Sequence, residues 1–167
     1  AKADPDATIA VMPADHVIEP EQEFRRALFA AEQFLADDPG KLVTFGIRPS
    51  FPSTGYGYIR RGAAAGTRQG VSASRVEKFE EKPPFPVAEQ YVASGGYDWN
   101  SGIFVWKPQT ILAELKARKP EIHAVVTRIA DAWGTAAFDE LFRETYKQAE
   151  KKSIDYAVMQ EAAAEGK

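Results

Sequence analysis

The chain has 167 residues, of which 44% are hydrophobic and 27% charged, and its formal charge is −3 at pH 7. These values fit one soluble globular domain, or a large part of one, rather than a disordered or fibrous chain. Zero cysteines and two histidines exclude disulfides, thiolate metal sites, cysteine nucleophiles and multi-histidine zinc centres. No apolar run reaches the roughly 20 residues of a membrane helix and no signal peptide is recognisable, so we expect a cytoplasmic protein.

The N-terminal part of the chain predicts a strand, a helix and a second strand. Residues 8–12 form a continuous apolar run that ends at a proline, which is typical of a central strand covered on both faces. A helix begins near Pro20 and ends at residues 38–40, and residues 41–47 form the second buried strand. This strand–helix–strand unit predicts a right-handed parallel crossover within an α/β sheet.

The remaining elements continue this mixed pattern and end in helices. The middle of the chain predicts a loop at 48–54, strands at 55–60 and 74–82 around a glycine-rich excursion at 62–70, a helix at 87–94 with its C-cap at Gly95, and a strand at 103–106. The C-terminal part predicts helices opened by Pro108 and Pro120, a third over 138–150, and a last one capped by Ser153. We therefore expect an α/β fold with helices on both faces of the sheet and a helical C-terminal portion.

Charge is unevenly distributed along the chain. Residues 39–76 contain no Asp or Glu but six basic residues: Lys41, Arg48, Arg60, Arg61, Arg68 and Arg75. A local cationic segment on an acidic chain suits a small anionic ligand better than nucleic acid, for which a whole domain is usually basic. The same composition fits a solvated surface that lacks acids, so charge alone leaves both interpretations open.

One candidate for metal chemistry is Asp15, which lies just beyond the C-terminal end of the first predicted strand. Ligands of open α/β sheets bind at that edge, and a carboxylate there can hold Mg²⁺, which often takes only one or two ligands from protein. The alternative is that Asp15 shapes the turn or caps the following helix. A structural role is the better explanation for the neighbouring His16.

Glu81, Lys82 and Pro83 end the second strand of the middle region. Neighbouring strand residues point to opposite faces, so both charged side chains reach one pocket only if the strand ends or twists there, as Pro83 favours. A Glu that accepts hydrogen bonds from sugar hydroxyls, beside a Lys that pairs with phosphate, would form a sugar-phosphate clamp. An ordinary surface ion pair is the alternative.

Three further places offer groups that suit a polar ligand. Asn100, just before a predicted buried strand, offers a donor and an acceptor that suit vicinal hydroxyls, but Asn-Ser-Gly is also a common turn. Gly55 and Gly57 either let the backbone approach a ligand or mark a bend in the strand. Asp155, in the first turn of the last predicted helix, is most simply an acid that stabilises the helix dipole.

Six segments, taken together in their order and spacing, resemble a known protein family, although none of them is specific by itself. These segments are Pro13-Ala-Asp-His16, Thr44-Phe-Gly-Ile47, Thr54-Gly-Tyr-Gly-Tyr-Ile59, Phe79-Glu-Glu-Lys-Pro83, Asn100-Ser-Gly-Ile-Phe104 and Ser153-Ile-Asp-Tyr-Ala-Val158. Together, over nearly the whole chain, they closely resemble the mannose-1-phosphate guanylyltransferases within the sugar nucleotidyltransferase family. The resemblance implies part of a Rossmann-like nucleotidyltransferase sheet.

The resemblance also implies a reaction in which GTP and mannose 1-phosphate give GDP-mannose and pyrophosphate, with Mg²⁺ as cofactor and neither nucleic acid nor membrane as partner. Such a transfer depends chiefly on positioning and electrostatics, so it needs no covalent nucleophile. By this resemblance Asp15 is a metal ligand near the nucleotide phosphates and Lys82 contacts the sugar phosphate. The residues implied to line the sugar site are Gly55, Tyr56, Gly57, Glu81 and Asn100, while Asp155 matches a motif without an assigned role.

Two segments of the family pattern are missing from residues 1–167. A glycine-rich nucleotide loop should lie well before Pro13, and a Trp-x-Asp-x-Gly segment with a second metal-binding Asp should follow the last motif. We therefore expect an incomplete catalytic domain that is inactive by itself and leaves Mg²⁺ with one protein carboxylate. A sheet without its first strands would expose an edge and invite self-association, and a homodimer is a candidate assembly.

Two other functions stay open. One is a nucleotidyltransferase for another sugar 1-phosphate, such as glucose 1-phosphate, although segments 54–59 and 153–156 favour the mannose branch. The other is a non-catalytic sugar-phosphate-binding module that kept this half of the fold. Titration with the two sugar phosphates tests the first alternative, and the flanking coding sequence tests the second.

Overall fold

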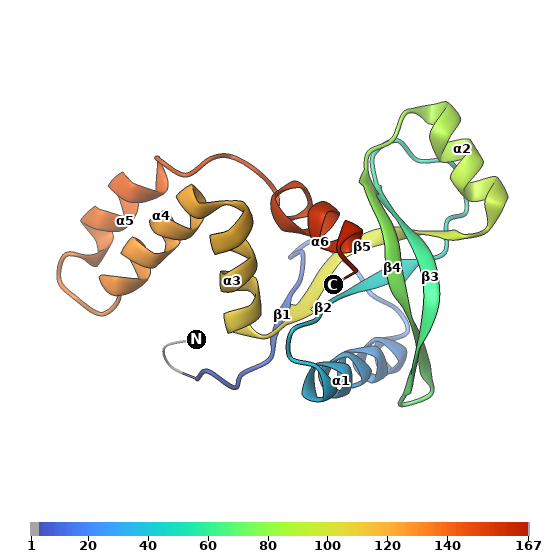
Figure 1. The fold of residues 1–167 in the computed structure, drawn as a ribbon, viewed down its shortest axis with the longest axis horizontal. Coiled ribbons are helices and arrows are strands. Elements are labelled where there is room, and N and C mark those ends of the chain that lie inside the picture. Colours follow the sequence, from blue (N-terminus) through green and yellow to red (C-terminus); the bar gives the residue numbers. More distant parts are fainter. Residues whose placement is uncertain (1–3, 167) are drawn as a thin grey trace.

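The computed structural model describes residues 4–166 and contains one five-stranded sheet with helices around it (Figure 1). The strands are β1 (Ile9–Val11), β2 (Leu42–Ile47), β3 (Gly57–Arg68), β4 (Val71–Glu81) and β5 (Tyr97–Trp106). The helices are α1 (Glu21–Asp37), α2 (Phe85–Ser94), α3 (Pro108–Arg118), α4 (Pro120–Asp131), α5 (Phe138–Tyr146), the π-helix η1 (Asp155–Met159) and α6 (Gln160–Ala164). None of the described helices combines the length and apolar character needed to cross a membrane.

Strand β5 forms the centre of the sheet, and β1 and β2 both pair with it in antiparallel fashion. Trp106 is paired with Ile9 on one edge and with Leu42 on the other, so β1 and β2 run in the same direction but are separated by β5. Strand β3 pairs antiparallel with the first part of β5 and carries β4 on its far side.

The α/β class is confirmed, but the predicted parallel pairing is wrong. The described strands pair antiparallel rather than in the parallel order of a Rossmann-like sheet. The physical reason is that β5, which comes much later in the chain, lies between the two strands of the expected crossover unit. Hydrophobic patterning marks where strands are but does not identify their neighbours.

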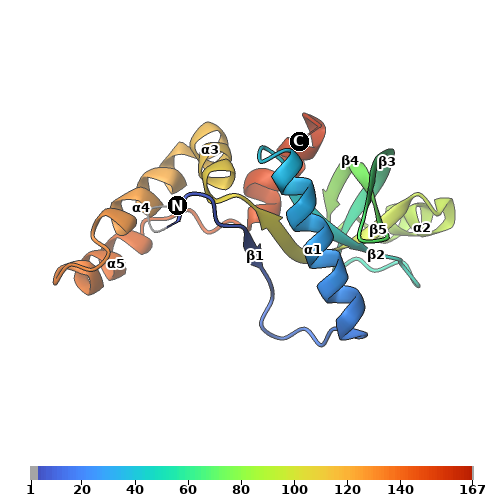
Figure 2. The same ribbon diagram turned by 90° about the horizontal axis from the view of Figure 1, so that it is seen from below.

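Helices cover both faces of the sheet, as predicted. Side chains alternate along a strand, so Phe104 and Trp106 face a core built with η1 and α6, whereas Val105 faces α1, where Ala31 and Leu35 are buried. Figure 2 shows α1 crossing in front of the sheet. A smaller core lies beneath α2 and consists of Tyr58, Ala88, Tyr91 and Trp99.

Strand β1 is exposed, which corrects the prediction of a central strand covered on both faces. Ile9 and Val11 are 37% and 43% exposed. Among the described residues β1 pairs with β5 alone, so its other edge keeps unpaired backbone donors and acceptors. The apolar run indicated a strand correctly but not that strand's place in the sheet.

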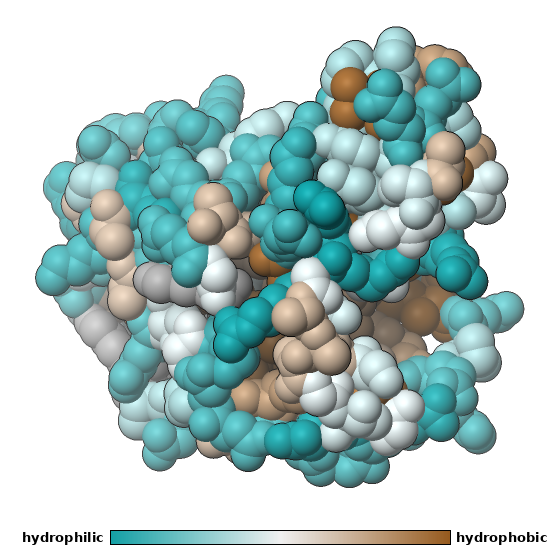
Figure 3. All heavy atoms as spheres, turned by 45° about the vertical axis from the view of Figure 1, so that its right-hand side comes forward, coloured by the Kyte–Doolittle hydropathy of each residue, from teal (hydrophilic) through white to brown (hydrophobic). Residues whose placement is uncertain are grey.

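Two parts of the molecule extend away from the sheet. The β3–β4 hairpin continues through the glycine-rich excursion to a turn at Gln69 and Gly70, whose φ values of 52° and 71° are those of a type I′ hairpin turn. Helices α4 and α5 pack on each other at the opposite end of the molecule, and α4 buries none of its residues (Figure 1). Figure 3 brings the hairpin side forward and shows mostly hydrophilic side chains with small hydrophobic patches.

The C-terminal helices differ from their predictions in two places. Helix α5 ends at Tyr146 rather than near Glu150. Ser153 does not cap the last helix: Ile154 takes the cap position without a side-chain hydrogen bond, and Ser153 accepts from Ala157 N–H through its backbone carbonyl at 2.9 Å. The prediction for Gly95 is confirmed, because it ends α2 at a left-handed φ of 66°.

An ion cluster centred on the buried Arg118 side chain joins α3 to α6. The Arg118 side chain is 7% exposed and pairs with Glu114 at 2.9 Å, with Glu161 at 3.3 Å and with Glu165 at 2.5 Å. Hydrogen bonds from this guanidinium to Glu165 first, and then to the other carboxylates, raise the pKa of Arg118 above its ordinary value. The cluster fixes α6, and with it η1, against the rest of the fold.

Candidate functional site

Three predicted site residues meet on the sheet face that η1 and α6 cover. Gly57 at the start of β3 is paired with Glu81 at the end of β4, and Asn100 lies on the neighbouring β5. A Cβ atom added to Gly57 would lie 2.3 Å from Glu81 Oε2 and 3.4 Å from Asn100 Cβ. The Glu81 carboxylate therefore occupies space beside Gly57 that any side chain at that position would take away.

Asn100 connects this group to the helical layer. Its Nδ2 donates to Asp155 Oδ1 on η1 at 2.9 Å. Its Oδ1 accepts from Gly102 N–H at 3.2 Å and lies 3.0 Å from the hydroxyl of Thr44 on β2. Four strands and η1 thus contribute to one polar cluster, which consists of Thr44, Gly57, Glu81, Asn100 and Asp155.

The polar cluster continues the hydrophobic core along one sheet face. On β5 the even-numbered positions change from aromatic, at Phe104 and Trp106, to polar at Asn100. Between these two parts the pairing with β2 shifts register, and Gly102 has a φ of 71°, which glycine adopts most readily. Asn100 was predicted just before the strand but lies inside β5, so sheet pairing rather than a loop positions it.

Lys82 follows Glu81 at the point where β4 ends. The Lys82 side chain is 55% exposed, whereas that of Glu81 is 10% exposed, and Nζ lies 3.3 Å from Glu81 Oε1. Lys82 has a φ of 49°, an unusual value for a non-glycine residue, and its N–H donates to the Tyr56 carbonyl at 3.2 Å. This backbone turn brings two consecutive charged side chains within reach of each other, as the strand end at Pro83 predicted.

Gly55 and Tyr56 do not join the polar cluster. A Cβ atom at Gly55 would meet only Ser53 Oγ, at an ordinary distance of 3.7 Å. The Tyr56 ring packs edge-on against the Trp99 ring, with 5.1 Å between centroids. Because Trp99 and Asn100 are consecutive strand residues, this contact lies on the face away from Asn100.

Asp15 lies in an exposed turn after β1. A Cβ atom at Gly102 would lie 3.6 Å from Pro13 Cγ, so this segment runs past the Asn100–Gly102 stretch. Among residues 4–166 no three His, Cys, Asp or Glu side chains gather in a way that could cage a metal ion. Asp15 could therefore hold Mg²⁺ only as a single carboxylate ligand, with phosphate oxygens and water completing the coordination.

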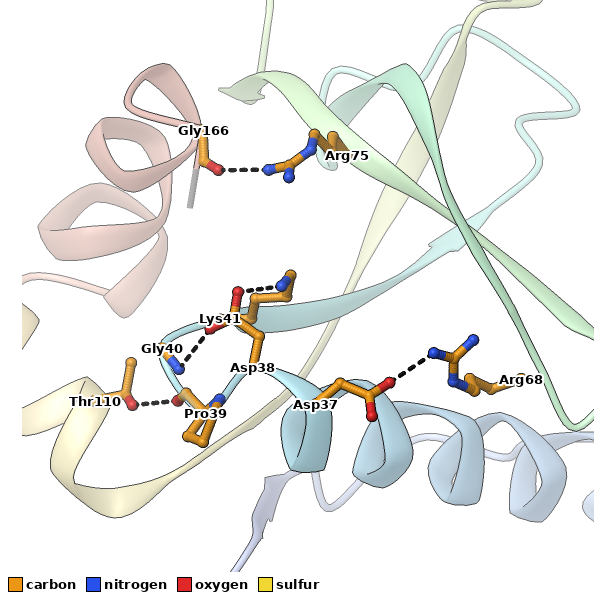
Figure 4. A network of polar contacts seen from close by, with 9 residues as sticks. All are labelled: Asp37, Asp38, Pro39, Gly40, Lys41, Arg68, Arg75, Thr110 and Gly166. Atoms are coloured by element: carbon orange, nitrogen blue, oxygen red, sulfur yellow. Dashed lines mark hydrogen bonds and ion pairs between the residues drawn. The ribbon is translucent and has the colours of Figure 1, made fainter.

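Most basic side chains of the cationic segment, Lys41 to Arg75, contact acidic side chains or carbonyl groups of the same chain. Arg68 pairs with Asp37 at 2.6 Å, Lys41 pairs with Asp38, and Arg75 donates to the Gly166 carbonyl at 3.2 Å (Figure 4). The other pairs are Arg60 with Glu77 and Arg61 with Asp98, and Arg48 is the one member without such a partner in the described part of the chain. The hydrogen bond from Lys41 lowers the pKa of Asp38. The segment thus links elements of the fold rather than presenting a row of free cations.

A second polar group, formed by Lys78, Glu80 and Tyr91, lies close to the cluster in sequence but on the other sheet face. Tyr91 Oη donates to Glu80 Oε2 at 2.6 Å, and Lys78 Nζ lies 2.5 Å from the same oxygen. The hydrogen bond between Lys78 and Glu80 lowers the pKa of Glu80 and raises that of Lys78, while burial raises the pKa of Tyr91. The Glu80 carboxylate is therefore already bound by Tyr91 and Lys78, and it does not join the polar cluster although it neighbours Glu81 in the sequence.

Sequence reasoning missed Thr44 as a member of the polar cluster and assigned no role to Asp155. Both belong to segments that carried the resemblance, so their motif membership was a signal. What the sequence did not show is that β2 and η1 meet at Asn100, because those contacts join residues 55 and 56 positions apart.

Comparisons with known proteins identify the family and several relatives of this chain. The family model described as nucleotidyl transferase matches residues 1–161. Mannose-1-phosphate guanylyltransferase from Escherichia coli K12 is 42% identical over 95% of the chain. The crystal structure of mannose-1-phosphate geranyltransferase from Thermus thermophilus matches 93% of the chain and 42% of its own, with a TM-score of 0.74 and 36% identity. That of mannose-6-phosphate isomerase from Helicobacter pylori matches 94% of the chain and 59% of its own, with a TM-score of 0.77 and 32% identity.

The curated relatives are much longer than the matched region. The chain spans about a third of their length, with 32% of a xanthan biosynthesis protein from Xanthomonas campestris covered and 33% of the E. coli protein. All residues of the polar cluster lie within the region that matches these relatives.

Proposed function

Because this chain belongs to the nucleotidyl transferase family, we propose that it takes part in transferring a guanylyl group from GTP to mannose 1-phosphate. In this reaction a phosphate oxygen of the sugar phosphate bonds to the α-phosphorus of GTP. The bond between that phosphorus and the bridging oxygen of the β-phosphate breaks, and pyrophosphate leaves. The chain supplies mainly the sugar-phosphate side of the site, and the observation that carries this proposal is the polar cluster with Lys82 at its margin.

Each residue has a role that fits its chemistry. Glu81, a largely buried carboxylate, accepts hydrogen bonds from sugar hydroxyls, and Asn100 contacts a further hydroxyl. The exposed Lys82 ammonium pairs with the sugar phosphate, where a flexible point charge suits the ligand. Gly57 keeps the space that Glu81 needs, as the 2.3 Å approach of an added Cβ atom indicates.

Asp15 is the residue of this chain that would hold Mg²⁺, together with nucleotide phosphate oxygens and water. When bound, this ion neutralises charge on the transferring phosphate. The rest of the proposed catalysis is positioning: the cluster fixes the sugar, and Lys82 holds its phosphate for in-line attack.

Titration calorimetry with mannose 1-phosphate and glucose 1-phosphate tests the proposal. We expect tighter binding of mannose 1-phosphate, and a loss of about tenfold in Lys82→Ala, since a charge-assisted contact contributes about 1.5 kcal/mol or more. Arg68→Ala is the matched control, because it removes a cation already paired with Asp37 and should leave affinity unchanged. Tighter binding of glucose 1-phosphate overturns the mannose assignment, and binding of neither overturns the proposal.

Turnover provides a second test. We expect no pyrophosphate release by the 167-residue chain with GTP, Mg²⁺ and mannose 1-phosphate, because its sequence offers no glycine-rich loop to hold the triphosphate. Robust release by this chain would contradict the proposal that it supplies mainly the sugar-phosphate side of the site.

A further inference from the structure

The side-chain amide of Asn100 has a fixed orientation. Gly102 N–H can only donate, so the atom 3.2 Å from it is the acceptor Oδ1. A carboxylate accepts, so the atom 2.9 Å from Asp155 Oδ1 is the donor Nδ2. These two contacts hold the two ends of the amide in the same orientation, and a flip by 180° would break both.

Thr44 adds to the crowding around the Asn100 oxygen. Its hydroxyl lies 3.0 Å from Asn100 Oδ1 and 3.1 Å from the Ile103 carbonyl oxygen. The hydroxyl has one hydrogen for these two acceptors, so Thr44 supports the orientation but does not define it. The contact with Asp155 is therefore the side-chain interaction that holds the Nδ2 end of the amide, while Gly102 N–H holds the oxygen end.

Counting donors and acceptors shows what Asn100 has left for a ligand. Its oxygen faces Gly102 N–H and the Thr44 hydroxyl, and one of its two N–H groups is used by Asp155. One N–H donor remains. This differs from the expectation that Asn100 offers both a donor and an acceptor to vicinal hydroxyls.

We propose that Asp155 is a positioning residue, which acts through Asn100: it holds the Nδ2 end of the amide, while Gly102 N–H and Thr44 face its oxygen, so that Asn100 meets the sugar with an N–H donor. The inference rests on the proposed function and deepens it. The ligand hydroxyl that Asn100 meets must accept a hydrogen bond, which leaves that hydroxyl free to donate its own hydrogen to the neighbouring Glu81 carboxylate. The cluster therefore selects a sugar whose hydroxyl bridges Asn100 and Glu81.

A double-mutant cycle on mannose 1-phosphate affinity, measured by calorimetry, tests whether Asp155 acts through Asn100. We expect Asn100→Ala and Asp155→Ala each to weaken binding about fivefold to tenfold. The double variant should be within twofold of Asn100→Ala, because Asp155 has nothing left to orient. Losses that multiply in the double variant would overturn the inference, since they would mean that Asp155 acts independently.

Two further variants separate positioning from other roles of an acid. Asp155→Asn keeps a carbonyl that can accept from Asn100, so binding should return to within about threefold of the unmodified chain. Asp139→Ala removes another first-turn acid, on α5, and should change nothing, because a helix-dipole effect is not what positions the amide. Equal losses in Asp155→Asn and Asp155→Ala would count against the inference.

A measurement on the ligand-free chain tests the orientation of Asn100 separately from the proposed function. In ¹H–¹⁵N spectra of the ligand-free chain, the Asn100 side-chain amide signals should shift in Asp155→Ala and stay near their positions in Asp155→Asn. Unchanged signals in Asp155→Ala overturn the positioning role, whether or not sugar phosphate binds. If the unmodified chain binds no mannose 1-phosphate, the proposed function fails and the sugar-recognition half of the inference fails with it, while these spectra still decide the orientation.

Discussion

The cationic segment and the polar cluster both gather polar groups, but they differ in what those groups already bind. In the cationic segment, five of the six basic side chains contact an acid or a carbonyl of this chain. In the polar cluster, the hydrogen bonds orient Asn100 and still leave one of its donors free, and Glu81 lies beside it with further acceptor capacity. In this chain the segment with the local excess of positive charge thus leaves fewer groups available to a ligand than the polar cluster does.

The same contrast separates two consecutive carboxylates. Glu80 accepts from Tyr91 and pairs with Lys78 on one sheet face. Glu81 turns to the other face, beside Gly57 and Asn100. One residue of displacement along a strand is enough to change a structural acid into a candidate ligand-binding acid.

The largest loss of ligand affinity is expected for Gly57→Ala, which would remove the difference between Glu80 and Glu81. The added Cβ atom would lie 2.3 Å from Glu81 Oε2, so the carboxylate, as the flexible end of its side chain, should move out of the cluster. We expect mannose 1-phosphate affinity to fall about tenfold to a hundredfold, with little change in the unfolding midpoint. Gly55→Ala is the matched control because its Cβ atom would meet only Ser53 Oγ at 3.7 Å, and equal effects of the two substitutions would contradict the assignment.

The backbone at Lys82 provides a second test, in which two variants should differ in stability but not in binding. A non-glycine residue at a φ of 49° carries strain, so Lys82→Gly should be about 1 kcal/mol more stable to denaturant than Lys82→Ala. Both variants should bind sugar phosphate equally poorly, because both lose the ammonium. Better binding by Lys82→Gly than by Lys82→Ala would show that the backbone, not the charge, makes the contact.

Smaller effects are expected from the paired arginines. Arg68→Ala removes an ion pair between side chains that are 39% and 58% exposed, and such pairs contribute about 0.2–1 kcal/mol. Denaturation should register a loss in that range while sugar-phosphate affinity stays the same. A clear loss of affinity would restore the interpretation of the cationic segment as an anion site.

The smallest effect is expected on stability at acid pH, where Glu80 should show the behaviour of a structural acid. Because its partners lower the pKa of Glu80 in the folded state, Glu80 contributes stability above its ordinary pKa of 4.5 and loses it as the pH falls through the lowered folded value. Glu80→Gln should therefore flatten the dependence of unfolding free energy on pH below about 4.5. An unchanged acid slope in denaturation series from pH 7 to pH 3 would argue against this linkage.

Sequence reasoning singled out most members of the polar cluster but not the contacts between them. The ending of β4 at Pro83 predicted that Glu81 and Lys82 reach the same region, and this is what the 3.3 Å approach of their charged atoms shows. It could not separate Gly55 from Gly57, because the difference depends on which side chain of another strand lies opposite. Asp155 stayed without a role for the same reason: its partner is 55 residues away.

The fold shows the same limit. Apolar runs predicted β1 and β2 as strands. Whether these two strands pair with each other depends on β5, and the sequence of β5 does not indicate which strands it lies between. Turn and cap chemistry was more informative, since Gly95 ends α2 by its own conformational freedom. Local preferences were readable, and long-range pairings were not.

The π-helical turn η1 makes the site sensitive to the length of its own helix. Gln160 N–H reaches back five residues to the Asp155 carbonyl, so this turn holds one residue more than an α-helical turn would. Each residue of an α-helix rotates the chain by about 100°. Since Arg118 anchors α6 through Glu161, deleting a single residue within η1 should swing the Asp155 carboxylate around the helix axis and away from Asn100. The surplus residue in this turn thus acts as a spacer that sets the direction of one side chain.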